Sequence, residues 1–198
     1  MKNNYWIVDE WLIFKPEFNE KLTYYYDVIN KYKKIMFSDY NDPLMAIETN
    51  NQYAVKYYGN YIESEFNQKI NLLNNVNLTH LTFGRCFNQE IDIPLNVKSL
   101  NMWYCNDQYM IDNLHNNIEE LIIYETNLNL DNLPNSIKKF HIQWYKKELN
   151  NLPNSIEYLE LINYKLKIKK IPKNLKTINC YRDYEYIDDF KDYEVITY

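Results

Sequence analysis

The segment LPNSI stands at Leu133–Ile137 and again at Leu152–Ile156, a spacing of 19 residues (152 − 133 = 19). Related segments share its order of apolar residues: LTHLTF from Leu78, IPLNVKSLNM from Ile93, LHNNIEELII from Leu114 and IPKNLKTINC from Ile171. A composition rich in Asn, Ile, Lys and Tyr does not readily place six such segments in one register. The segment therefore predicts a structural repeat.

Each copy carries apolar residues at fixed positions. The residue that closes LPNSI has its counterparts at steps of 19, 21, 19, 19 and 19: Leu78, Val97, Ile118, Ile137, Ile156 and Leu175. Three and five residues further on, apolar residues alternate with others, as in a strand with one buried face. These predicted core residues are Leu81, Phe83, Leu100, Met102, Leu121, Ile123, Phe140, Ile142, Leu159, Leu161, Ile178 and Cys180. The order L-x-x-L-x-L is the strand signature of a leucine-rich repeat.

The length of the copy limits what returns the chain from one strand to the next. Nineteen residues are too few for a strand, two turns and a full α-helix, so the return limb is predicted to be extended or short 3₁₀ structure. Proline, which suits an extended limb, precedes the strand at Pro94, Pro134, Pro153 and Pro172. The predicted fold class is an α/β repeat, a leucine-rich-repeat-like solenoid over residues 57–182. It has a parallel β-sheet on one face and a non-helical convex side.

Both ends of the predicted solenoid need a cap, because its terminal strands would otherwise be exposed. Residues 1–56 are predicted to form a small mixed α/β N-terminal cap, with a helix from Pro16 and short strands at Ile35–Phe37 and Leu44–Ile47. Residues 183–198 are acidic, and the apolar pattern fails near Glu194, so a polar C-terminal cap or tail is expected there.

Two segments carry a family resemblance. FNQKI at Phe66–Ile70 and LTFGRCFNQEI at Leu81–Ile91, together with the LPNSI copies, resemble the FNIP repeat, a leucine-rich-repeat relative of amoebae and giant DNA viruses. The resemblance covers roughly residues 57–182. Its Phe–Asn pair appears within the array at Phe66/Asn67 and Phe87/Asn88. In later copies Leu128, Leu149 and Leu166 are expected to fill a similar place.

The resemblance also implies an alternative role for the N-terminus. Some FNIP-repeat proteins carry an F-box there, which would make them ubiquitin-ligase adaptors. The leading motif and the Leu-rich helices of an F-box are missing from residues 1–56. A cap is therefore the favoured interpretation, with the adaptor as the alternative.

Composition excludes several classes of partner. The net charge of −5 gives no general attraction to a phosphate backbone or an anionic membrane, and no apolar run is long enough to span a bilayer. The six lysines of Lys165–Lys176 leave nucleic-acid binding as a third alternative, against a solvated face of the repeat. Three cysteines are a sparse and odd set, which favours a reducing, cytoplasmic location.

No residue pattern points to catalysis, a metal or a cofactor. Cys86 and Cys105 lie eight residues after Leu78 and Val97, where the repeat favours Asn or Cys, and no Cys/His spacing suggests zinc. The three histidines fall in separate copies without the spacing of a triad, and two glycines form no phosphate-binding loop. The chain is expected not to be an enzyme and to bind no cofactor.

Function is therefore sought on the strand positions that point away from the predicted core. Aromatic and apolar side chains there are typical anchors of protein interfaces, although they could equally stack on one another along the sheet. The predicted partner-binding residues are Trp103, Glu120, Ile122, Tyr124, Lys139, His141, Tyr158, Glu160, Ile162 and Tyr181. The leading hypothesis is a non-enzymatic, intracellular protein–protein interaction module whose protein partner is unknown.

Overall fold

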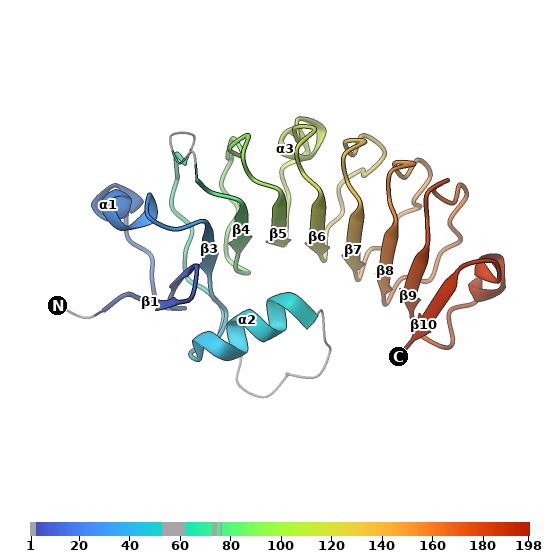
Figure 1. Ribbon diagram of the computed structural model, residues 1–198, viewed down its shortest axis with the longest axis horizontal. Helices are drawn as coiled ribbons and strands as arrows, with labels where there is room; N and C mark the ends of the chain where they lie inside the picture. The colour runs from blue at the N-terminus through green and yellow to red at the C-terminus, as the bar shows by residue number, and fades with distance from the viewer. Residues whose placement is uncertain (1–2, 53–61, 73–74, 76) are drawn as a thin grey trace. The chain divides into compact units, whose positions relative to one another are not determined.

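The computed structural model describes residues 3–52, 62–72, 75 and 77–198, and its chain forms two units, Met1–Tyr104 and Cys105–Tyr198 (Figure 1). The predicted start of the solenoid at residue 57 lies outside the described residues. Each unit is described by itself below.

The first unit contains a five-stranded sheet. Its strands are β1 (Tyr5–Val8), β2 (Trp11–Phe14), β3 (Lys34–Phe37), β4 (His80–Phe83) and β5 (Ser99–Trp103). The β1–β2 pair is an antiparallel hairpin, whereas β2, β3, β4 and β5 are paired in parallel. Leu12, Ile35, Leu81 and Leu100 align across the four parallel strands. Parallel pairing therefore begins at β2, within the segment for which the sequence indicated a cap.

The second unit contains five parallel strands in chain order. They are β6 (Glu120–Tyr124), β7 (Lys139–Gln143), β8 (Tyr158–Ile162), β9 (Thr177–Cys180) and β10 (Glu194–Thr197). The expectation that the repeat pattern ends before Glu194 is wrong, because Glu194 is aligned with Thr177 and Val195 with Ile178. Backbone hydrogen bonds continue the sheet although its apolar pattern weakens. The fold is a leucine-rich-repeat-like solenoid, as predicted.

The core of each unit lies between its strands and its return limbs. All twelve strand residues predicted for the core are at most 3% exposed. Val97, Ile118, Ile137 and Ile156, which enter the strands, are fully buried. The fixed register therefore stacks equivalent apolar side chains from one copy onto the next, so neighbouring copies share one core.

The return limbs are mostly extended. One α-helical turn, α3 (Gln108–Asp112), occurs in the copy with the 21-residue step, where Asp107 Oδ1 accepts the N–H of Met110 at 3.2 Å. A 3₁₀ turn, η2 (Ile187–Phe190), precedes β10. The limb residues expected to replace Phe–Asn behave unequally: Leu149 is buried and Leu128 half-buried, but Leu166 is exposed. In that copy Ile168, two residues later, is buried instead, so the expectation for Leu166 is wrong.

The N-terminal segment differs from the expected cap in two places. The helix expected from Pro16 is limited to a 3₁₀ turn, η1 (Leu22–Tyr25), followed by α1 (Tyr26–Ile29). The strand expected at Leu44–Ile47 is instead part of helix α2 (Pro43–Gln52). Asp42 Oδ1 accepts the N–H of Met45 at 2.9 Å, so Asp42 caps the helix and Pro43 occupies its first position. These signals for the start of a helix outweigh the short apolar run at Leu44–Ile47, which also suits a strand.

Phenylalanine rings fill the core of the first unit. Phe37 is stacked on Phe66 with ring centroids 3.9 Å apart, on Phe14 at 5.1 Å and on Phe83 at 5.7 Å. Phe66 is in turn stacked on Phe18 at 5.6 Å and on Phe87 at 6.0 Å. All of these rings are buried. Aromatic stacking thus takes the place that leucine fills in many repeats of this type.

A ladder of asparagines runs beside these rings. Asn19 Oδ1 accepts the backbone N–H of Asn67 at 3.1 Å, and Asn67 Oδ1 accepts that of Asn88 at 3.1 Å. Gln68 Nε2 and Gln89 Nε2 donate to the same two oxygens. Because Phe18 precedes Asn19, the chain has a third Phe–Asn pair, within the segment that the sequence indicated was helical.

Gly84 follows β4 at a point where a side chain does not fit. A Cβ there would contact Ser64 Cβ and lie 2.8 Å from Asp39 Oδ1 and 2.9 Å from Phe37 O. Asp39 Oδ1 also accepts the backbone N–H of Ser64 at 2.7 Å and of Arg85 at 3.1 Å. Burial raises the pKa of Asp39 to about 6, against the lowering effect of these donors. Glycine therefore permits the close approach of three coils around one buried carboxyl group.

Candidate protein-interaction surface

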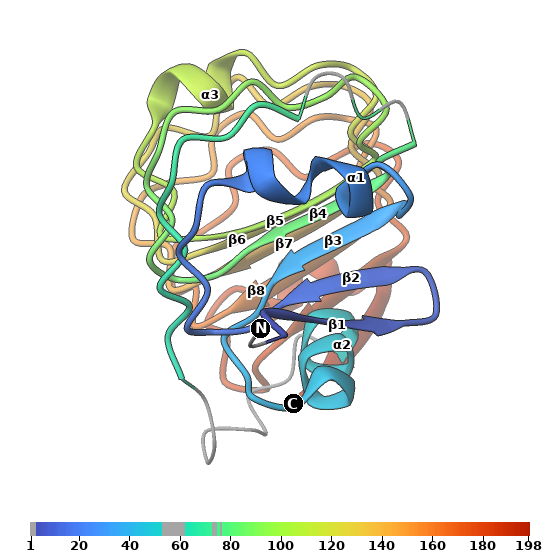
Figure 2. The same ribbon diagram turned by 90° about the vertical axis from the view of Figure 1, so that its left-hand side faces the viewer.

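Part of the strand face in the first unit is covered by α2. Trp11, Ile13 and Met36 on β2 and β3 form a buried cluster with Ala46 of α2, and Figure 2 shows the helix beside the β1–β2 hairpin. Trp103, at the end of β5, remains half-exposed. The guanidinium carbon of Arg85 lies 4.2 Å from the centre of the Trp103 ring, a cation–π contact that fixes the indole. In this unit Trp103 is thus the accessible residue among those predicted to bind a partner.

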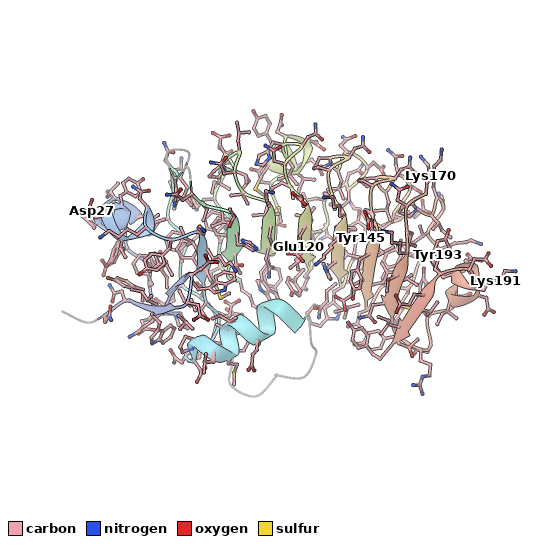
Figure 3. All side chains as sticks on the ribbon, viewed as in Figure 1. Asp27, Glu120, Tyr145, Lys170, Lys191 and Tyr193 are labelled. Atoms are coloured by element: carbon pink, nitrogen blue, oxygen red, sulfur yellow. The ribbon has the colours of Figure 1, made fainter. Side chains whose placement is uncertain are left out.

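The first position of each strand in the second unit is accessible. Lys139 and Glu194 are exposed, whereas Glu120, which Figure 3 labels on β6, Tyr158 and Thr177 are half-buried. Lys139 Nζ lies 3.9 Å from Glu120 Oε1. From β6 to β8 this row changes from acidic to basic to aromatic, whereas the core residues behind it are uniformly apolar.

The middle and last positions of these strands are not open to solvent. Ile122, His141 and Glu160 occupy the middle position of β6, β7 and β8, and Tyr124 and Ile162 the last position of β6 and β8. All five are buried. The expectation that these residues face solvent is wrong. They do point away from the apolar core, as alternation requires, but solvent hardly reaches them.

The buried middle row of the second unit contains a polar network. His141 Nδ1 lies 2.6 Å from Glu160 Oε2, and the two side chains are 4% and 1% exposed. Asn179 Nδ2 donates to Glu160 Oε1 at 2.8 Å. It also lies 2.7 Å from the hydroxyl oxygen of Tyr198 and 3.3 Å from that of Tyr158. The network therefore joins β7, β8 and β9 to the accessible tyrosines at the end of the unit.

Burial disfavours the charged form of both acid and base in this network. It raises the pKa of Glu160 to about 8, partly offset by the hydrogen bond from Asn179. Burial, together with the charge of Lys139, lowers the pKa of His141 to about 3. Burial therefore favours the neutral pair, in which the carboxylic acid of Glu160 donates a hydrogen bond to neutral His141. A substrate cannot reach groups so deeply buried, so this pair is a structural hydrogen bond.

Replacing Glu160 by Gln is expected to remove a pH dependence from the free energy of unfolding. The pKa of Glu160 is higher in the folded chain than in the unfolded chain, where it is near 4.5. Its contribution to the free energy of unfolding is therefore fully present below pH 4.5 and is lost as the pH rises through about 8. The Gln amide can donate to His141 and accept from Asn179 at every pH. Urea unfolding at pH 6.5 and pH 9 should show the natural chain losing stability relative to Glu160→Gln.

Glu157→Gln is the matched control for this measurement. Glu157 lies on the same coil and is half-buried. The Lys176 ammonium beside it lowers its pKa, so the stabilisation by the Glu157 carboxylate is lost only as the pH falls. Parallel pH profiles for Glu160→Gln and the natural chain would contradict a raised pKa of Glu160.

Tyrosines form the accessible aromatic group of the second unit. Tyr158 and Tyr181 are half-buried and Tyr198 is exposed. The rings of Tyr181 and Tyr198 are 5.6 Å apart. We call these three residues the tyrosine patch. Sequence reasoning missed Tyr198 because it assigned the C-terminal residues to a tail and did not expect β10.

Half of the lysines of Lys165–Lys176 have acidic neighbours. Lys167 Nζ lies 3.1 Å from Asp189, Lys169 Nζ lies 2.6 Å from Glu148 and Lys176 Nζ lies 2.5 Å from Glu157. Three of the six lysines are thus compensated on the protein itself. This compensation weakens the alternative of a nucleic-acid surface, which needs an excess of positive charge.

The cysteines form no disulfide and contribute to the packing. Cys105 and Cys180 are buried, and burial raises the pKa of each thiol to about 11. Cys86 is half-buried. Across the described residues, no group of three or more His, Cys, Asp and Glu side chains could hold a metal ion. No helix in the described part of the chain is both long and apolar enough to cross a membrane.

Comparison with known proteins adds one similarity. No protein-family model matches the chain, and no curated protein matches its sequence. Among solved structures, the chain is similar to CroV588, described as a novel circular LRR protein structure, with 18% sequence identity and a TM-score of 0.46. The similarity covers 90% of this chain and 41% of CroV588, so the chain spans less than half of that protein.

Proposed function

We propose that this chain is a non-enzymatic protein-interaction module that binds a partner protein through the accessible part of its strand face. Leucine-rich-repeat-like folds commonly serve as interaction modules, because stacked copies present an extended and rigid surface. The observation that carries the proposal is the tyrosine patch. Asn179 Nδ2 donates to the Tyr198 hydroxyl at 2.7 Å and lies 3.3 Å from that of Tyr158, so these rings are already positioned and little side-chain entropy is lost on binding.

The buried residues on this face have a supporting role in the proposed interface. His141 and Glu160 position Asn179, which contacts the hydroxyl groups of Tyr158 and Tyr198. Tyr is enriched at protein interfaces, whereas Lys is depleted from their core, so the exposed Lys139 suits the polar rim of the proposed interface. In the first unit Trp103, held by Arg85, is the corresponding candidate anchor. The proposed contact residues are therefore fewer than those expected from strand alternation alone.

The proposed type of repeat is the FNIP repeat. The support is the ladder of Phe–Asn pairs, in which the side chains of Asn19 and Asn67 each accept a hydrogen bond from the next coil. We propose that the array includes the coil of Phe18 and Asn19 and therefore begins before residue 57. A reducing compartment such as the cytoplasm suits three cysteines that form no disulfide.

Affinity capture with the full chain as bait tests the proposed surface. Tyr158→Ala combined with Tyr181→Ala is expected to lower the amount of captured partner at least about tenfold, because each anchor of this kind contributes roughly 1 to 2 kcal/mol. Tyr109→Ala, an exposed tyrosine on α3 of the same unit, is the control and should leave capture unchanged. Equal capture by all three proteins would contradict the proposed surface.

The adaptor alternative is tested by changes on the N-terminal segment. Deleting residues 1–56 would remove β1, β2 and β3 from the sheet of the first unit and is therefore unsuitable. Leu44 is exposed on α2 and is one of the apolar side chains that an N-terminal partner could contact. Loss of capture in Leu44→Asp, with capture retained in the tyrosine double variant, would favour the adaptor.

A further inference from the structure

The return limb between β8 and β9 has a high density of positive charge. Residues 163–176 include six lysines and no Asp, Glu or Arg. The limb between β7 and β8, residues 144–157, has no net charge (2 − 2 = 0), and the limb between β9 and β10, residues 181–193, has a net charge of −3 (2 − 5 = −3). The charge of the limbs therefore changes sharply from one coil of the second unit to the next.

The limb between β8 and β9 lies beside the limb between β7 and β8. The rings of Tyr145 and Tyr164 are stacked with centroids 6.3 Å apart. Further along, Lys169 Nζ lies 2.6 Å from Glu148 Oε2. Between these two contacts the limbs contain four exposed lysines: Lys146, Lys147, Lys165 and Lys167. The lysines of the two limbs thus belong to one continuous surface.

Carboxylates of the chain itself neutralise only part of this surface. Lys167, Lys169 and Lys176 each have an acidic neighbour on an adjacent limb. The other lysines on the two limbs are exposed and form no ion pair within the described part of the chain. They are Lys146, Lys147, Lys165, Lys170 and Lys173, which we call the basic limb. Figure 3 labels Lys170 at the outer margin of the second unit. These five ammonium groups are available to an external anion.

We propose that the basic limb binds an extended acidic peptide segment of a partner protein. On this non-helical limb Lys165, Lys167 and Lys169 stand at every second position, and Ile168 between them is buried. An extended peptide directs every second side chain to one side, at a spacing of roughly 7 Å, so alternate acidic residues match this order. Each lysine ammonium has three N–H donors, so those with a carboxylate neighbour still accept a second one.

The carboxylates of the chain show that this type of ligand fits these lysines. Asp189 reaches Lys167 from one adjacent limb at 3.1 Å, and Glu148 reaches Lys169 from the other at 2.6 Å. Both carboxylates come from beside the limb and leave its outer side accessible, since Lys167 and Lys169 remain exposed. A peptide that lies along the limb therefore repeats a contact that the protein already makes on both sides.

Nucleic acid suits the basic limb less well than an acidic peptide. Binding of single strands relies on exposed aromatic rings for base stacking, but Tyr164, the one aromatic residue of residues 163–176, is 4% exposed. This segment also contains no arginine, the residue that binds phosphate through two parallel hydrogen bonds. A long polyanion that crosses the coils would meet the net charge of −3 on the next limb, whereas a short peptide along one limb does not.

Fluorescence anisotropy with the full chain tests this proposal. The probe is a labelled peptide of about twelve residues with Glu at every second position and Ser or Gly between them. We expect saturable binding that weakens at least about fivefold when NaCl rises from about 50 to about 300 mM, because salt screens exposed charges. The same peptide with Gln in place of Glu should not bind. An absence of binding by the Glu peptide at about 1 mM protein would overturn the proposal.

Two lysine variants localise the binding. Lys165→Gln combined with Lys170→Gln should raise the Kd of the Glu peptide at least about threefold, because exposed ion pairs contribute modestly one by one. Lys31→Gln combined with Lys69→Gln is the matched control. It makes the same change of net charge at two exposed lysines of the first unit and should bind like the natural chain. Equal weakening in both double variants would show a general charge effect and contradict the assigned surface.

Two further measurements separate this proposal from its alternatives. Tyr158→Ala combined with Tyr181→Ala should bind the Glu peptide like the natural chain, because the basic limb is independent of the tyrosine patch. Loss of peptide binding in that variant would place the peptide on the strand face instead. A labelled single-stranded RNA of about twenty nucleotides should bind more weakly than the Glu peptide. Tighter binding of the RNA would overturn the choice of an acidic peptide in favour of nucleic acid.

Discussion

Replacing Leu159 by Asp is expected to abolish the cooperative unfolding of the second unit. Leu159 is fully buried between Phe140 and Ile178 in the aligned strands. The change removes a buried apolar side chain, at a cost of about 2 to 5 kcal/mol, and buries a carboxyl group without a designed partner, at a further cost of several kcal/mol. Together these costs approach the roughly 5 to 15 kcal/mol of a whole folded domain.

Thermal unfolding followed by circular dichroism measures this effect. Leu121→Asp, at the same register position of β6, should behave like Leu159→Asp, because its side chain is also fully buried. Leu166→Asp is the control in the coil of Leu159, and its partly exposed side chain should allow a Tm close to that of the natural chain. A Leu159→Asp protein that melts like its parent would show that the register is wrong.

Replacing Phe37 by Ala is expected to destabilise the first unit by about 3 to 5 kcal/mol, the usual range for a buried phenylalanine. Phe37 is 1% exposed and its ring is stacked on Phe14, Phe66 and Phe83. Its removal leaves a cavity among rings from neighbouring coils, which cannot close around it without shifting the strands. The loss also removes aromatic contacts worth roughly 0.5 to 1.5 kcal/mol each.

The free energy of unfolding in urea measures this second effect. Tyr24→Ala is the control, since Tyr24 belongs to the same unit and is 79% exposed. Its unfolding free energy should change by less than about 0.5 kcal/mol, as is usual for surface positions. A Phe37→Ala protein as stable as Tyr24→Ala would show that the ring stack contributes little.

The sequence predicted the repeat well because one physical quantity, the spacing of buried side chains, recurs in every copy. Ile137 and Ile156 fix the strands that follow them, and the 21-residue step before Ile118 coincides with the added helix α3. The spacing of buried side chains did not predict two elements. β10 is held by backbone hydrogen bonds despite its weak apolar pattern, and α2 is started by Asp42 and Pro43 in a run that also suits a strand.

The candidate surface was harder to predict than the fold. Alternation along a strand shows on which side a residue points, but not how much solvent reaches it. Glu160 and His141 therefore looked like contact residues, whereas both are buried. The contact between these two side chains could nevertheless have been predicted from the sequence. Matching positions in successive 19-residue copies lie side by side on a parallel sheet, so His141 and Glu160 (160 − 141 = 19) had to be neighbours.

The constant step from β7 to β8 to β9 also governs how this chain could change in length during evolution. A duplication of 19 residues would insert one complete coil and leave every strand on either side in its present alignment. A deletion of one residue within a strand would instead turn the side chains that follow it to the opposite face. Growth and loss by whole coils are therefore the tolerated route, and they alter the reach of the accessible surface without disturbing its architecture.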